Sequence, residues 1–134
     1  MKFIQTLLIL FCALVFSMPA IAQRAANSQL LTDATATGAG TEVQPVCATT
    51  KTFQAYGITS AGAGAATVVI EASNLSSPTA GTRVDWVTLG TITLTLSTTR
   101  SGDGFVSDAR WRYIRAYVSA ISGTNATVNV FMGC

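Results

Sequence analysis

The segment TITLTLS, residues 91–97, alternates aliphatic side chains with small polar ones at every position. Ile92, Leu94 and Leu96 are the aliphatic residues, and a threonine or serine stands before and after each of them. Successive side chains of a β-strand point to opposite faces, so this pattern predicts a strand with one buried and one solvated face. Strands of this kind are typical of an antiparallel sheet that meets water on one side.

The same two-residue period recurs along much of the chain, and no segment has a convincing helical period. Turn sequences separate the strand-like segments, for example SGDG at residues 101–104 and SGTN at residues 122–125, and residues 57–66 are expected to form a loop. The expected strands are residues 52–56, 67–73, 84–89, 91–99, 105–106, 112–120 and 126–132. About seven short strands separated by turns predict an all-β fold, a single antiparallel β-sandwich of jelly-roll or immunoglobulin-like type.

Residues 1–22 have the composition of a secretory signal peptide. Lys2 supplies a positive charge, residues 3–16 form an apolar stretch, and Ala20-Ile21-Ala22 precedes the expected cleavage site before Gln23. A membrane anchor is the alternative, but a helix that spans a bilayer needs about 20 apolar residues, and this stretch is shorter. We therefore expect a mature chain of about 112 residues that is exported to the periplasm, the cell surface or the medium.

Two cysteines, Cys47 and Cys134, remain after removal of the signal peptide. An even pair in an oxidising compartment predicts a disulfide bond. The bond would close a loop of about 88 residues and stabilise the fold by roughly 4–5 kcal/mol in the chain-entropy model. An intermolecular bond through the terminal Cys134 is the alternative.

Residues 23–46 are rich in alanine, threonine, glycine and glutamine and have no sustained apolar pattern. We expect this segment to form a flexible N-terminal arm or an extended segment that ends near Pro45. The β-sandwich domain is expected over residues 47–134.

Composition argues against several classes of function. A formal net charge of +2 is too small for a protein that follows nucleic-acid phosphates. The chain contains no histidine, which removes the commonest general base and the commonest zinc ligand. Asp103 and Asp108 lack the regular ligand spacing of a calcium site, so turn formation is the simpler interpretation. We expect no catalysis, no cofactor and no bound metal.

The candidate binding residues lie in the segment RWRYIRAYV, residues 110–118. If this segment is a strand, its aliphatic residues face the core, and three aromatic side chains and an arginine share the opposite face. These four residues are Trp111, Tyr113, Arg115 and Tyr117. Such a stripe can stack on sugar rings or pack against another protein. Two alternatives stay open: a neighbouring loop covers the stripe, or Trp111 bends inward at the start of the strand.

A second candidate surface is the threonine ladder of the opening segment, formed by Thr91, Thr93 and Thr95. A regular ladder of this kind can face ice or an extended partner strand. The alternative is an ordinary solvent-exposed face, which a single ladder without repeats favours.

Several segments in the second half of the chain form a set: VTLGTITL at residues 87–94, GDGF at 102–105, WRYIRA at 111–116 and ISGTNATV at 121–128. Together they resemble small β-sandwich proteins of phage virions, which serve as head-decoration or tail-appendage modules. The resemblance covers residues 84–133 and implies a binding or structural role without catalytic residues. A signal peptide and a disulfide are unusual in virion modules, which indicates a use outside the inner membrane.

The sequence therefore predicts a non-enzymatic, exported β-sandwich that acts as a structural or surface-attachment module, in the exported fraction or on virions. Its partner would be a protein, such as a capsid or appendage component or another copy of this chain, or a surface glycan. A secreted carbohydrate-binding, lectin-like module is the alternative. We expect no nucleic-acid partner, and no membrane span after cleavage of the signal peptide.

Overall fold

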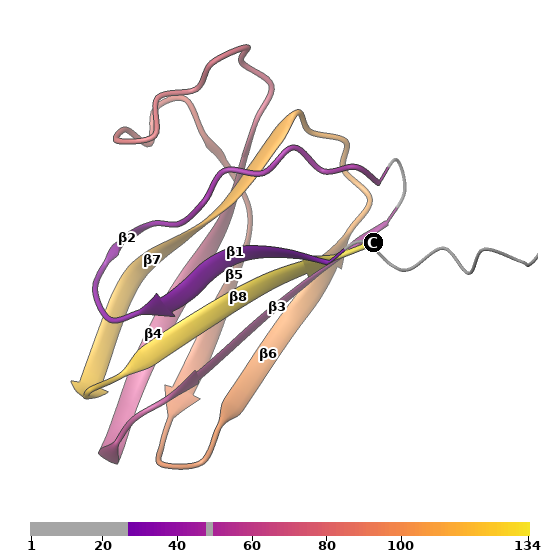
Figure 1. Ribbon diagram of the computed structural model, residues 1–134. Helices are drawn as coiled ribbons and strands as arrows, with labels where there is room; N and C mark the ends of the chain where they lie inside the picture. Colours follow the sequence, from indigo (N-terminus) through magenta and orange to yellow (C-terminus); the bar gives the residue numbers. More distant parts are fainter. Residues whose placement is uncertain (1–26, 48–49) are drawn as a thin grey trace, which may run out of the picture.

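The computed structural model describes residues 27–47 and 50–134, which form two antiparallel sheets of four strands each (Figure 1). The expected signal peptide, residues 1–22, lies outside the described residues. The strands are β1 (Ser28–Ala34), β2 (Gly38–Ala39), β3 (Lys51–Ile58), β4 (Ala61–Ser73), β5 (Val87–Leu96), β6 (Ser101–Ser107), β7 (Tyr113–Thr124) and β8 (Thr127–Gly133). The all-β, two-sheet architecture expected from the sequence is confirmed, with eight strands in the described residues where about seven were expected.

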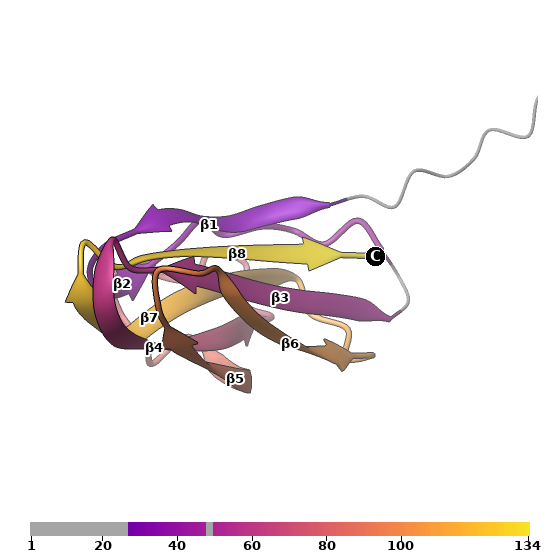
Figure 2. The ribbon, with the colours of Figure 1, turned by 90° about the horizontal axis from the view of Figure 1, so that it is seen from below.

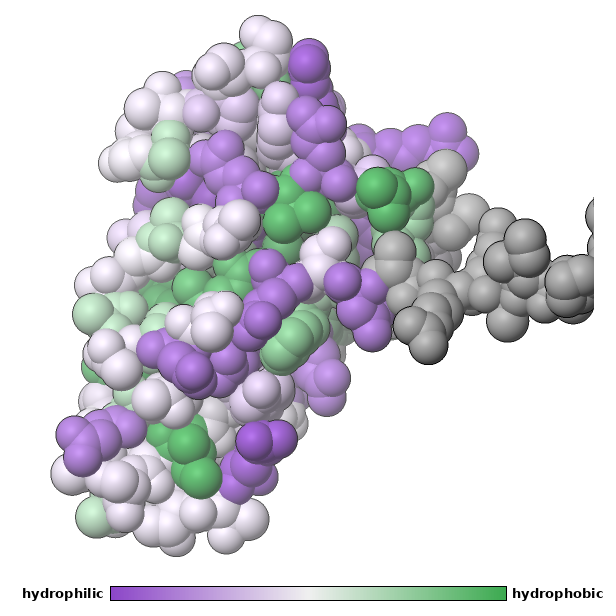
Figure 3. Space-filling model, in the orientation of Figure 1, coloured by the Kyte–Doolittle hydropathy of each residue, from purple (hydrophilic) through white to green (hydrophobic). Residues whose placement is uncertain are grey.

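Sheet I has the strand order β1-β8-β3-β6, and sheet II has the order β2-β7-β4-β5. Figure 2 shows the two sheets as separate layers, and the hydrophobic core lies between them. Aliphatic residues of both inward faces form this core; its largest members include Leu30, Phe53, Ile70, Ile92, Leu94, Leu96, Ile114 and Met132. On the side of the molecule seen in Figure 3, the surface is mostly hydrophilic or near neutral, and apolar residues show in limited areas.

The N-terminal segment corrects one expectation. Residues 23–46 were expected to form a flexible arm or an extended segment outside the β-sandwich domain. In the structure β1 pairs with β8, β2 pairs with β7 and Val43 pairs with Ile114, so this part is extended and belongs to the two sheets. Leu30 and Leu31 of β1 are both buried in the core. Two register shifts in the β1 ladder accompany this burial of two adjacent side chains, which a strict two-residue period does not predict.

Strand β4 is longer than expected because residues 61–66, assigned to a loop, extend it. This part of β4 consists of alanine and glycine, which favour strands weakly, yet Gly64 pairs with Leu96 and Ala65 pairs with Thr95. A Cβ on Gly64 would lie within 3.0 Å of Thr59 Cγ2 and closer still to the Ser122 carbonyl oxygen. Tertiary packing therefore overrides the local propensity in this segment.

Strand β5 joins two segments that the sequence separated at Gly90. The strand continues through this glycine with a register shift opposite Ile70 and Glu71. A Cβ on Gly90 would lie 2.5 Å from Cζ of Phe105, a residue of β6 in the other sheet. Gly90 is thus required by the close approach of an aromatic ring, and it does not end the strand.

Cys47 and Cys134 form the expected intrachain disulfide, with their Cα atoms 5.7 Å apart. The bond connects the segment before β3 to the residue that follows β8. The connection from β6 to β7 lies at the same end of the sandwich, where Thr50 Oγ1 donates a hydrogen bond to Asp108 Oδ1 at 2.8 Å. The disulfide therefore fixes the C-terminus beside the loops at that end.

Candidate functional site

The candidate binding residues lie at the start of β7 and on its outer face. Ile114, Ala116 and Val118 point into the core and are fully buried, as the alternation predicts. Tyr113, Arg115 and Tyr117 share the opposite face of sheet II. The sequence therefore assigns the two faces of this strand correctly.

Arg115 is nevertheless inaccessible, because its side chain is 0% exposed. Its Nε donates to Glu71 Oε2 at 2.9 Å, and its Nη1 and Nη2 donate to the carbonyl oxygens of Ala80 and Thr82 at 2.6 and 3.2 Å. Every nitrogen of the guanidinium group thus has an acceptor inside the protein. The expectation that Arg115 contacts a partner is wrong, since a partner cannot reach it.

The covering loop, residues 74–86 between β4 and β5, accounts for this burial. Its Trp86 is buried, places its ring 4.0 Å from Cζ of Arg115, and donates its indole N–H to the Thr79 carbonyl at 3.2 Å. Its Arg83 binds Glu71 Oε1 at 2.6 Å and lies 4.7 Å from the centre of the Tyr117 ring. Both alternatives stated for the stripe apply in part: this loop covers Arg115, and Trp111, just before β7, packs against the core.

Glu71 is the centre of this arrangement, and the sequence did not single it out. Its carboxylate is almost fully buried, and each oxygen accepts from a different arginine, Arg83 or Arg115. A buried carboxylate is costly unless it is paired and hydrogen-bonded, so the two arginines are what make its burial tolerable. We call Glu71, Arg83, Trp86 and Arg115 the anchor cluster.

Tyr113 and Trp111 lie at the edge of the covered region. The Tyr113 hydroxyl donates to the Ser76 carbonyl at 3.3 Å, and Cζ of Arg112 lies 5.6 Å from its ring centre. Trp111 is partly buried and packs against the core. Its indole N–H is buried and has no hydrogen-bond partner among the described residues.

An apolar hollow of about 340 Å³ lies beside the covering loop, with Trp111 as one of its walls. Three aliphatic residues that line it are exposed: Leu75 at 50%, Val84 at 89% and Val87 at 54%. We call Leu75, Val84, Val87 and Trp111 the apolar patch. The first two belong to the covering loop, so the loop that hides the stripe also presents this patch.

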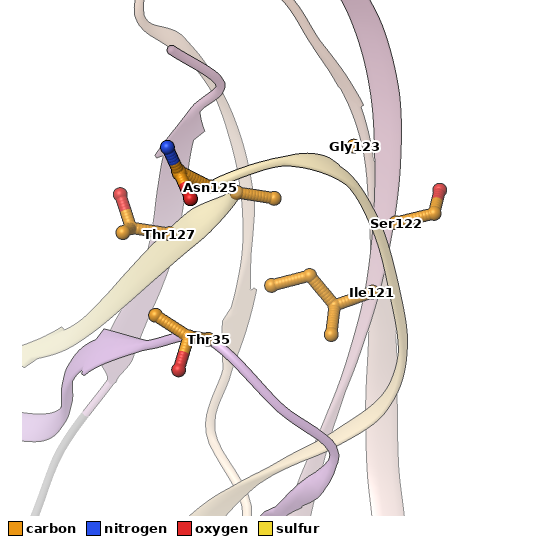
Figure 4. Close-up of a pocket in the computed structure, with 7 residues that line it drawn as sticks. Thr35, Ile121, Ser122, Gly123, Asn125 and Thr127 are labelled. Atoms are coloured by element: carbon orange, nitrogen blue, oxygen red, sulfur yellow. The ribbon is translucent and has the colours of Figure 1, made fainter.

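A second hollow of about 460 Å³ lies at the opposite end of the sandwich, around the turn between β7 and β8 (Figure 4). The residues that line it include Thr35, Ile121, Ser122 and Thr127. Asn125, in the turn, has a positive φ of 47° and donates its side-chain amide to Ser60 Oγ at 3.1 Å. None of the residues that line this hollow is charged, so their side chains offer hydrogen bonds but no ionised acid or base.

The two aspartates considered for calcium binding accept hydrogen bonds within the protein. Asp103 Oδ1 accepts from the backbone N–H of Gly104 at 2.7 Å, and Asp108 accepts from Thr50. In the described part of the chain, no three His, Cys, Asp or Glu side chains are grouped so as to hold a metal ion. That same part contains no helix with the length and apolarity needed to cross a membrane.

No protein-family model matches the sequence, and no curated protein matches it. Among solved structures, the chain is similar to the crystal structure of PBSX exported protein XepA, with a TM-score of 0.46 and 12% identity over 81% of this chain. The chain spans 36% of the length of that protein. A likeness this distant carries no information about ligands, so function must be inferred from the geometry of this chain.

Proposed function

We propose that this chain is an exported, non-enzymatic β-sandwich that serves as a structural or surface-attachment module, of the kind its sequence resembles in phage virions. It binds a protein partner through the apolar patch. The observation that carries the proposal is the gathering of exposed Leu75, Val84 and Val87 around one hollow. Contiguous apolar surface on a soluble domain marks interaction sites, whereas apolar residues exposed singly do not.

The disulfide supports export. Disulfides persist in oxidising compartments and are rare in the cytosol. Cys47 and Cys134 are far apart in the sequence, yet they meet within one chain, so the bond stabilises the domain itself. Together with the signal-like composition of residues 1–22, this pairing favours a mature protein that acts outside the cytoplasm.

Direct recognition of sugars is less well supported than contact with a protein. A sugar-binding platform needs free aromatic faces, but arginine side chains lie over the rings of Trp86, Tyr113 and Tyr117. The apolar patch is mainly aliphatic, which suits the apolar side chains of a protein better than a sugar ring. The lectin-like alternative is therefore kept as an outcome of the test.

The test uses the mature, disulfide-bonded protein in the cells that produce it. We would compare wild type with Val84→Glu, and use Val106→Glu as the matched control, because Val106 is also an exposed valine (61%) but lies on β6. Neither position is buried, so both variants should fold. The amount of protein bound to envelope and particle fractions would be measured, with intact mass on each fraction and binding to an immobilised glycan panel.

The proposal predicts a chain that starts at Gln23, is oxidised, and is associated with particles or envelope. Val84→Glu should reduce the bound fraction about tenfold, as expected for a residue at the centre of an interface, while Val106→Glu should not. Equal binding of the two variants would overturn the role of the apolar patch. Binding to glycans that is lost in Tyr113→Ala would favour the lectin-like function.

A further inference from the structure

We propose that the free edge of β5 is a self-association edge, where β5 of one chain pairs antiparallel with β5 of a second copy. An edge strand presents unpaired backbone N–H and C=O groups, and folded proteins usually protect such edges against pairing with another chain. The two sheets have four edge strands, β1, β6, β2 and β5. Among the described residues, each of the first three carries features that disfavour pairing, whereas β5 carries such features only at Gly90 and is regular from Thr91 to Leu96.

Each of the other three edge strands has a feature that disfavours pairing with another chain. β1 is interrupted by two register shifts, and the Leu30 carbonyl accepts from the N–H of Thr41. β2 is two residues long. β6 carries Asp103 together with Gly102 and Gly104, and a charge and glycines on an edge strand both disfavour pairing.

β5 has a glycine and a register shift at Gly90, but it has none of these features from Thr91 to Leu96. The strand is ten residues long and contains no charged residue and no proline. Its only ladder is with β4, and its register is continuous from Thr91 to Leu96. β6 is the neighbouring edge of the other sheet, but it pairs with β3 and forms no ladder with β5. Figure 2 shows β5 at the outer margin of sheet II.

The sequence of β5 fits a second copy of itself. In a two-fold register centred on Thr93, Thr93 opposes Thr93, and Thr91 opposes Thr95 on the exposed face. Ile92 then opposes Leu94 on the buried face of the extended sheet. Cross-strand threonine pairs and aliphatic pairs both favour pairing, and shared two-fold symmetry is the commonest arrangement of homodimers.

The alternation also restricts the register. A shift by one residue would place each threonine opposite an aliphatic side chain, because successive side chains point to opposite faces. Thr91, Thr93 and Thr95 are exposed, whereas Ile92, Leu94 and Leu96 are buried. Threonine therefore opposes threonine, and aliphatic opposes aliphatic, only when the two-fold axis passes through a residue and not between two residues. The threonine ladder is thus explained as the outer face of a self-complementary edge. This inference does not depend on export or on the apolar patch.

The test is the oligomeric state of the mature, disulfide-bonded protein by analytical ultracentrifugation over a range of concentrations. Thr93→Lys and Thr93→Glu each place like charges opposite each other at the two-fold axis. Since such a pair is destabilising, either variant should raise the dimer Kd about fivefold relative to wild type. An equal mixture of the two variants should restore association, because lysine then opposes glutamate.

Gln54→Lys provides the matched control, because Gln54 is exposed on the outer face of β3, a central strand of sheet I. It adds the same charge without touching the β5 edge, so the dimer Kd should not change. Hydrogen exchange of the β5 amides should also slow as the protein concentration rises. A protein that stays monomeric at about millimolar concentration would overturn the proposal, as would a dimer whose Kd is the same in Thr93→Lys and wild type. Loss of partner binding in Val84→Glu with the dimer intact would show that the two proposals stand separately.

Discussion

Removal of Arg115 is predicted to detach the covering loop and to destabilise the fold strongly. Arg115→Ala leaves Glu71 Oε2 buried without its cation, and leaves the carbonyl oxygens of Ala80 and Thr82 without their donors. Breaking a buried ion pair by removing one partner costs about 3–5 kcal/mol. A small domain has a total stability of roughly 5–15 kcal/mol, so the loss is a large share of it.

Two comparisons separate this effect from a general effect of charge removal. Arg83→Ala removes the second ligand of Glu71, but the Arg83 side chain is 49% exposed, so solvent screening should hold the cost to about 1 kcal/mol or less. The double variant Glu71→Met, Arg115→Met replaces the buried pair by apolar side chains. The two loop carbonyls and the half-exposed Arg83 then lose partners, so the free energy of unfolding should lie within about 2 kcal/mol of the wild-type value.

Urea unfolding with the disulfide intact measures these differences. With a slope of about 2 kcal/mol per M, Arg115→Ala should lower the midpoint by about 2 M, and amides of residues 74–86 should exchange faster in native buffer. In the double variant the urea midpoint should return to a value close to that of the wild type. A loss below about 1 kcal/mol for Arg115→Ala, or no recovery in the double variant, would refute the view that a buried ion pair holds the covering loop.

Three further predictions concern the fold. Cys134→Ser should lower the free energy of unfolding by about 4–5 kcal/mol in non-reducing buffer. Its melting temperature should equal that of the reduced wild type, and equal melting temperatures before reduction would contradict this prediction. Leu30→Ala should lower the free energy of unfolding, measured with urea, by about 2–5 kcal/mol if β1 belongs to the core. The change should be close to zero if residues 28–34 behave as an arm. Gly90→Ala should cost about 1–3 kcal/mol because of the ring of Phe105, and Phe105→Leu in the same chain should relieve most of that loss in thermal melts.

The long strands could be predicted from sequence because the alternation of side chains within each strand is enough to identify it. In β5 and β7 the aliphatic residues repeat at every second position, and the buried faces of both strands are the predicted ones. The same holds for the disulfide, since Cys47 and Cys134 are the two cysteines outside the signal-like segment of residues 1–22 and allow one intrachain pairing between them. These features depend on local pattern or on counting, and neither requires knowledge of distant contacts.

The N-terminal strands β1 and β2 could not be predicted because their stability comes from elsewhere in the chain. β1 contains only two large apolar residues, the adjacent Leu30 and Leu31, and becomes a strand by pairing with β8 at the other end of the sequence. β2 is two residues long and depends on β7 in the same way. The alanine- and glycine-rich start of β4 is a third case, because its small side chains are dictated by close backbone neighbours.

The candidate site shows a related difference: alternation predicts the face of a side chain but not what covers that face. Two signals in the sequence do bear on the cover. Glu71 lies on the outer face of β4 directly opposite Arg115 in the ladder, so the face carries a charged pair between aromatic residues. The connection that follows β4 runs from residue 74 to residue 86, far longer than the roughly two to five residues of a common hairpin loop.

A long connection between adjacent antiparallel strands has to lie against one face of the sheet or extend into solvent. Residues 74–86 contain a tryptophan and an arginine, Trp86 and Arg83, which gain most by packing against an aromatic and carboxylate surface such as the one around Tyr117 and Glu71. The connection therefore folds over the stripe, and its own aliphatic residues, Leu75 and Val84, stay exposed. The proposed interaction surface therefore lies on the covering loop and not on β7, because Arg115 and Tyr117 of β7 already contact residues of that loop.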